Sequence, residues 1–99
     1  MFVIREVLYC HPGKVRPLVD KFRSISGFAQ KAGYGPMRIL TDVTGERFWT
    51  VVFESEAETL DGFFEMEQRL MSDEEARAVM AGYHDLVVEG RREIFRLES

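Results

Sequence analysis

The order of its patterned segments constrains this chain more than any other feature. Four segments have the composition of β-strands, and they span residues 2–9, 37–43, 47–54 and 91–97. Two further segments carry apolar residues at helical spacing, over 14–32 and 56–88. A chain of 99 residues is short enough for one domain. We therefore expect a single domain, residues 1–99, with the order strand, helix, strand, strand, helix, strand.

The boundaries of these segments carry signals of their own. Gly33 can adopt the left-handed conformation that ends a helix, and residues 44–46 suit a short hairpin loop. Two S-x-x-E capping boxes mark helix starts, Ser55 with Glu58 and Ser72 with Glu75. They predict two helices, about 56–70 and 73–88, or one helix broken near residues 71–72. Gly90 is expected to end the last helix.

Both faces of the strands look apolar, which has a consequence for assembly. Alternate positions of the first strand place Phe2, Ile4 and Leu8 on one face and Val3, Val7 and Tyr9 on the other. The third strand places Trp49, Val51 and Phe53 opposite Phe48 and Val52. The segment order is that of a ferredoxin-like α+β domain with a four-stranded antiparallel sheet, whose helices cover one face only. The other face would be a large apolar patch, so we expect a homodimer packed sheet to sheet.

With this segment order and these strands, the chain resembles the dimeric α/β-barrel superfamily. The resemblance rests on the strand that ends in Pro12-Gly13 before a long amphipathic helix, on the FWTVVFE strand, and on the divided second helix leading to REIFRL. Within the superfamily the chain looks most similar to NIPSNAP-like and antibiotic-biosynthesis-monooxygenase-like proteins. The Arg-x-Tyr of the NIPSNAP first strand is not reproduced, because Arg5 and Tyr9 are separated by three residues.

The resemblance implies a homodimeric barrel with a small-molecule pocket in each subunit, between the sheet and the helices. One activity that it implies is cofactor-independent oxygenation of an aromatic or apolar substrate. The alternatives are a non-catalytic structural or stress-associated dimer of NIPSNAP-like type, and a haem-binding protein. Haem-degrading members use an asparagine on the first strand, and this chain contains no asparagine. We therefore expect no cofactor, and haem binding stays as the weaker alternative.

His84 is the candidate catalytic residue. On a helical wheel it lies at the flank of an apolar face that includes Val79, Met80 and Tyr83. It could serve as a base, as a hydrogen-bond donor in the pocket, or as an axial haem ligand. The competing interpretation is a half-exposed histidine that bonds to a nearby carbonyl group. No second ligand or orienting carboxylate faces it at helical spacing.

Three further residues are expected to line the pocket: Arg5, Trp49 and Tyr83. Arg5 and Glu6 put one charge on each face of a central strand, and the one that faces the helices could orient a substrate. The sequence leaves open which of the two does so. The competing interpretation is an ion pair with a charged residue on a neighbouring strand. Trp49 could equally be part of the core.

Composition and spacing argue against several other classes of protein. Thirteen basic and seventeen acidic residues give a net charge of −4, which disfavours binding to nucleic acid. The third strand also lacks the glycine and the second stacking aromatic of an RNA-recognition domain. No apolar run is long enough to span a membrane, and no Cys/His spacing fits a metal site. The single cysteine, Cys10, and the lack of a signal-like N-terminus lead us to expect a cytoplasmic protein.

Overall fold

The computed structural model describes all of residues 1–99 and contains one four-stranded sheet with helices. The strands are β1 (Phe2–Cys10), β2 (Arg38–Thr41), β3 (Thr50–Ala57) and β4 (Val87–Arg96). The helices are α1 (Val15–Lys31), α2 (Leu60–Ser72) and α3 (Glu74–Met80), and a short 3-10 helix, η1 (Tyr83–Asp85), follows α3. All neighbouring strands are antiparallel and the sheet order is β2-β3-β1-β4. The ferredoxin-like α+β fold and its divided second helix are therefore confirmed.

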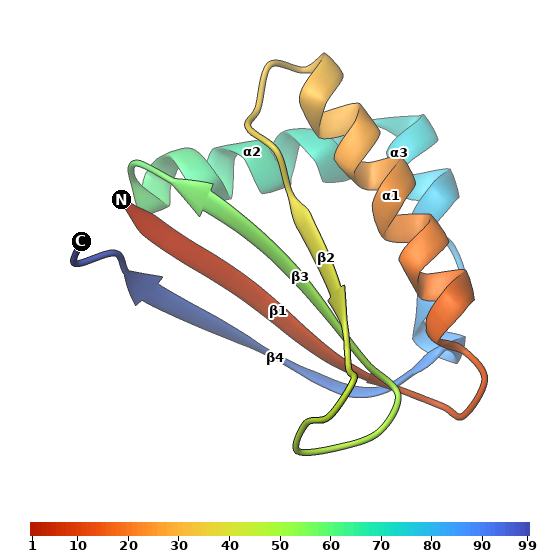
Figure 1. The fold of residues 1–99 in the computed structure, drawn as a ribbon. Helices are drawn as coiled ribbons and strands as arrows, with labels where there is room; N and C mark the ends of the chain where they lie inside the picture. The colour runs from red at the N-terminus through yellow and green to blue at the C-terminus, as the bar shows by residue number, and fades with distance from the viewer.

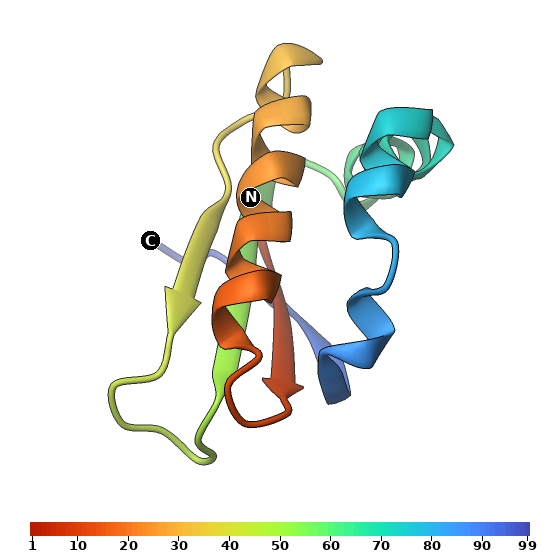
Figure 2. The ribbon, with the colours of Figure 1, turned by 90° about the vertical axis from the view of Figure 1, so that its right-hand side faces the viewer.

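All three helices lie on one side of the sheet, with α3 beside α1 (Figures 1 and 2). We call this side the helix face and the other side the open face. The core under α1 includes Leu18, Phe22 and Val51, and the ring of Phe22 stacks on that of Phe53 at 4.4 Å between centroids. A second cluster includes Ile4 of β1, Ile25 of α1 and Met66 of α2. The even positions of β1 thus share one face, as the alternation predicts, and the structure shows that this face lies under the helices.

The end of α1 follows its sequence signal. Gly33 has a φ of 90°, in the left-handed region that glycine adopts without steric cost. The N–H of Tyr34 donates to the carbonyl of Ala29, and the N–H of Gly33 donates to that of Gln30, both at 3.0 Å. These two bonds form a Schellman motif, which satisfies carbonyl groups that the last turn would otherwise leave unpaired. The prediction that Gly33 caps this helix is confirmed.

The third strand begins later than predicted, at Thr50 instead of residue 47. The connection from β2 is a loop over residues 42–49, not a three-residue turn, and Asp42 Oδ1 closes it by accepting a 2.8 Å bond from the N–H of Thr50. Trp49 has a φ of 62°, which is incompatible with a strand. The aromatic pair Phe48 and Trp49 has high strand propensity but belongs to the loop, because tertiary pairing with β1 sets the register.

The second half of the chain also departs from the predicted boundaries. The cap of α2 is Thr59, whose Oγ1 accepts from the N–H of Gly62, and the cap of α3 is Asp73, which accepts from Ala76. Neither predicted serine starts a helix. Gly90 does not end a helix but lies within β4 opposite Leu8. A Cβ at position 90 would lie 2.4 Å from Leu8 Cδ2, so glycine there makes room for the leucine.

The open face is more polar than the alternation suggested. A row of paired residues crosses all four strands in the order Arg38, Glu54, Arg5, Glu93, and its charges alternate in sign. Glu54 is 4% exposed because Arg5 and Arg38 bond to its two oxygens. The prediction that both faces are apolar is therefore wrong for this row. None of the helices is both long and apolar enough to cross a membrane.

Candidate functional site

A cavity of about 250 Å³ lies between the helix face of the sheet and the helices. Twelve of the sixteen residues that line it are hydrophobic. They come from every layer of the fold and include Ile4 and Leu8 of β1, Phe53 of β3, Ile25 of α1, Met66 of α2 and Met80 of α3. A concave, mainly apolar surface with a few polar groups is typical of small-molecule sites.

One side of the cavity is charged, and we call its three residues, Glu6, Glu67 and Arg92, the polar wall. Glu6 and Arg92 are register partners on β1 and β4, and Arg92 Nε donates to Glu6 Oε1. Arg92 also bonds to Glu67 on α2, and its guanidinium lies 5.2 Å from the centroid of the Phe63 ring. The arginine therefore ties the edge strand of the sheet to the helix above it.

Burial changes the acid–base properties of the polar wall. Desolvation raises the pKa of the Glu6 carboxyl above its usual value of 4.5, and the bond from Arg92 offsets this only in part. The negative charge of Glu67 also raises the pKa of Glu6. A carboxyl group with a raised pKa in a cavity is a candidate for proton transfer or for binding a donor group.

The structure shows which of the two charged residues of the first strand faces the helices. Glu6 faces the helices and the cavity, while Arg5 lies on the open face, where its Nε donates to Glu54 at 2.8 Å. Burial alone would raise the pKa of Glu54, but the bonds from Arg5 and Arg38 outweigh it and lower that pKa. Arg5 therefore belongs to the ion-pair row of the open face and does not line the cavity.

Of the four residues predicted for the site, Tyr83 alone lines the cavity. His84 is exposed, and its ring lies against that of Tyr83 at 4.0 Å between centroids. Trp49 lies in the 42–49 loop with 43% of its surface exposed. The helical wheel misplaced His84 because the last helix stops at Met80 and η1 turns the chain in a different direction.

Two residues of the polar wall were not anticipated from the sequence. Only the alternation of side chains along β4 indicates that Arg92 lines the cavity. Arg91 faces the open side of the sheet, and the next residue, Arg92, faces the cavity. The sequence would have indicated which residues of β4 face the cavity if the first residue of this strand had been known. Glu67 has no comparable signal, because it is one of several acidic residues on α2.

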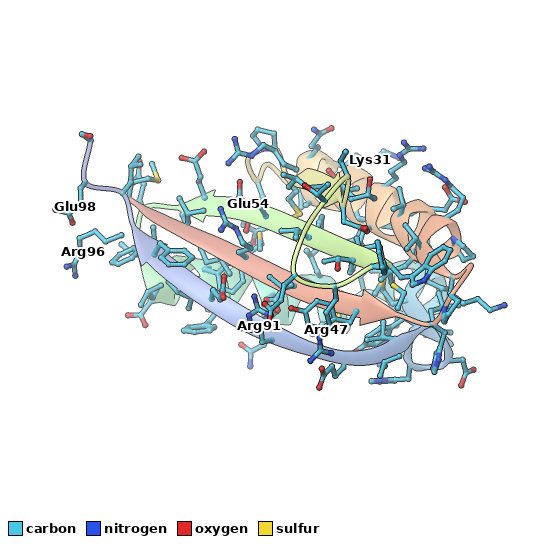
Figure 3. All side chains as sticks on the ribbon, turned by 60° about the horizontal axis from the view of Figure 1, so that its bottom comes forward. Lys31, Arg47, Glu54, Arg91, Arg96 and Glu98 are labelled. Carbon is cyan, nitrogen blue, oxygen red and sulfur yellow. The ribbon has the colours of Figure 1, made fainter.

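The open face carries a second hollow, of about 320 Å³, between the 42–49 loop and the strands. The loop passes in front of the sheet in Figure 3, where Arg47 and Arg91 lie close together. Both guanidinium groups lie over the ring of Tyr9, at 4.3 and 5.7 Å from its centroid, and Arg91 also donates to its hydroxyl at 2.5 Å. Each of the two arginines is also paired with a glutamate, so this hollow has no uncompensated cation.

The structure holds no cluster of three or more His, Cys, Asp or Glu side chains placed to bind a metal ion. No histidine lines the cavity, since both His11 and His84 are exposed. Cys10 is buried, and burial raises the pKa of its thiol, which keeps it in the unreactive protonated form. The chemistry available in the cavity is therefore that of Glu6, Glu67, Arg92 and two hydroxyl groups, of Ser55 and Tyr83.

Comparison with known proteins gives the fold independent support. No family model and no curated protein matches the sequence. A NIPSNAP family protein with unknown function from Agrobacterium tumefaciens is 18% identical, with a TM-score of 0.82 over 98% of this chain and 87% of that one. An uncharacterized NIPSNAP domain protein from Burkholderia xenovorans is 17% identical, with a TM-score of 0.81 over 100% and 96%.

A structure of an antibiotic biosynthesis monooxygenase is also similar, with 9% identity and a TM-score of 0.74 over 100% of both chains. At these identities the likeness concerns the fold. The predicted resemblance is thus confirmed at that level: the chain has the ferredoxin-like fold of NIPSNAP-like and monooxygenase-like proteins.

Proposed function

We propose that this protein binds a small, largely apolar or aromatic molecule in the cavity between its sheet and its helices. The cavity itself carries the proposal: it is a half-open space of about 250 Å³ lined mainly by hydrophobic side chains, with a cluster of three charged residues. Apolar pockets with a few polar groups are the usual form of small-molecule sites. An aromatic body of one or two fused rings suits this shape.

Isothermal titration calorimetry with naphthalenemethanol, a neutral aromatic probe, tests the proposal. Ser55 lines the cavity from β3, so Ser55→Leu should fill part of it without removing an apolar contact. Ser24→Leu, at an exposed position of α1, is the matched control. We expect saturable binding to the native protein and to the control, and at least tenfold weaker binding to Ser55→Leu. Equal affinities for the two variants would place the probe elsewhere.

A catalytic form of this function is cofactor-independent oxygenation of the bound molecule. It is supported by the fold shared with an antibiotic biosynthesis monooxygenase and by a carboxyl group with a raised pKa in the cavity. The base in this scheme is Glu6 in place of His84, because His84 does not line the cavity. Oxygen uptake with an easily ionised naphthol, lost in Glu6→Gln and kept in His84→Ala, would support it. Uptake that depends on His84 would contradict this assignment.

Assembly as a homodimer through the open face is the second part of the proposal. A twofold axis along the strands would place Arg38 opposite Glu93 of the partner subunit and Glu54 opposite Arg5 of the partner subunit. In this orientation each charge of the row faces an opposite charge of the same row on the partner subunit. Opposite charges across an interface favour one register of the two sheets. A twofold axis across the strands would instead set like charges against each other.

Analytical ultracentrifugation at micromolar concentration tests this assembly. We expect twice the 11.5 kDa mass of one chain, and a shift toward the monomer in Glu93→Arg. Glu74→Arg, the same charge change at an exposed position of α3, should leave the mass unchanged. A native protein that sediments as a monomer contradicts the dimer. A dimer that binds no aromatic probe would favour the alternative of a non-catalytic structural dimer.

A further inference from the structure

The polar wall of the cavity contains one more negative charge than positive charge. Glu6 and Glu67 are both carboxylates, and Arg92 is the one cation among the sixteen residues that line the cavity. Arg92 donates hydrogen bonds to both carboxylates: its Nε donates to Glu6, and both Nη atoms donate to Glu67. Glu6 Oε2 accepts no hydrogen bond in the structure. The unused bonding capacity of the wall is therefore that of an acceptor with excess negative charge.

Partial burial strengthens the effect of this excess negative charge. The Glu6 side chain is 26% exposed, so its charge is partly removed from water and interacts more strongly than a charge on the surface. Burial raises the pKa of Glu6, which means that the charged form lacks full compensation. The other polar groups that face the cavity, the hydroxyls of Ser55 and Tyr83, are neutral. No further arginine or lysine is present to receive an anionic ligand.

We propose that the molecule bound in this cavity carries a protonated amine, which Glu6 Oε2 receives while the apolar body of the ligand occupies the rest of the cavity. The inference deepens the proposed function and rests on it. A cationic head group makes the wall neutral, with two positive and two negative charges. A carboxylate head group would raise the imbalance to three negative charges against one, and a neutral alcohol would satisfy the acceptor without balancing its charge.

Three probes with the same aromatic body separate these cases: naphthalenemethylamine, naphthalenemethanol and naphthoic acid, each titrated calorimetrically at pH 7. We expect the native protein to bind the amine about tenfold more tightly than the alcohol, because bonds to charged groups are roughly twice as strong as neutral ones. The acid should bind more weakly than the alcohol. In Glu6→Gln the amine and the alcohol should bind with similar affinity.

Glu58→Gln is the matched control for this substitution. It removes the same charge from an exposed position between β3 and α2 that does not line the cavity, so it should keep the preference for the amine. A preference lost equally in both variants would mean that net charge alone is responsible, and this would overturn the inference. If Glu6→Gln fails to fold, the titration of the native protein with the three probes still tests the preference for the amine.

The outcomes distinguish this inference from the proposed function. If none of the three probes binds, the cavity is not a site for aromatic molecules and the proposed function fails. If the probes bind but the acid binds as tightly as the amine or more tightly, the proposed function stands and the head-group assignment is wrong.

Discussion

Replacing Glu54 by glutamine should destabilise the protein through the loss of one buried charge. Glu54 is the only charged residue in the buried set, and it bonds to Arg5 through Oε1 and to Arg38 through Oε2. The amide of glutamine keeps the shape of the side chain. It offers one acceptor in place of two and removes the negative charge between the two guanidinium groups.

The size of the effect follows from the exposure of the partners. A hydrogen bond to a charged group contributes roughly 1.5–3 kcal/mol when it is buried, while exposed ion pairs contribute about 0–1 kcal/mol. In a single chain the side chains of Arg5 and Arg38 are 39% and 64% exposed, so water still solvates them after the substitution. The loss that follows from these exposures is that of one chain, and the proposed dimer would add the loss of the contact between Glu54 and Arg5 of the partner subunit. We therefore expect a loss of about 2 kcal/mol in the free energy of unfolding, less than for a fully buried pair.

Urea denaturation at one fixed protein concentration measures this loss, with Glu58→Gln, at an exposed position between β3 and α2, as the control. The control should change stability by less than about 0.5 kcal/mol, as exposed substitutions usually do. The pKa of Glu54 is lower in the folded protein than its usual value of 4.5. Its contribution is therefore complete above that value and disappears as the pH falls through the folded pKa.

The gap between the native protein and Glu54→Gln should accordingly be widest near pH 7 and close in acid. Equal stabilities of Glu54→Gln and Glu58→Gln at pH 7 would show that the charge between the two arginines contributes nothing to the free energy of unfolding. A gap that widens in acid would contradict the direction of the pKa shift.

Three further predictions concern other parts of the fold. Glu6→Gln should gain stability relative to the native protein as the pH rises above 4.5, opposite to Glu54→Gln, because the folded pKa of Glu6 is raised; urea midpoints between pH 4 and 8 give the slope. Gly33→Ala should cost about 1 kcal/mol, since alanine is strained at a φ of 90°, whereas Gly27→Ala within α1 should be neutral or stabilising in the same assay. Gly90→Ala should push the Leu8 side chain into the cavity and weaken the binding of naphthalenemethanol, and unchanged affinity would mean that Leu8 moves elsewhere.

The architecture could be predicted because it depends on short-range periodicity. Successive strand residues point to opposite faces, so the two faces of β1 follow from its sequence alone, and Gly33 ends α1 through a local preference of glycine. The predictions failed where tertiary pairing overrode local preference. Phe48 and Trp49 look like strand residues, but the pairing of Thr50 with Tyr9 leaves them in the loop.

The site could be predicted only in part, because its walls come from distant segments. Arg92 meets Glu6 across a separation of 86 residues and Glu67 across 25. The sequence indicated that Arg5 or Glu6 would face the cavity, but alternation alone does not say which face the helices cover. The helical wheel places His84 by extending the last helix beyond Met80, but the helix ends there and η1 sets the direction of His84 instead.

A crystal structure of the protein soaked with naphthalenemethanol would show whether the space between the sheet and the helices is a binding site. We expect density for the aromatic ring among Leu8, Phe53 and Met80, with its hydroxyl directed at the polar wall. Density on the open face alone, or a cavity closed by the side chains of Met66 and Met80, would contradict it.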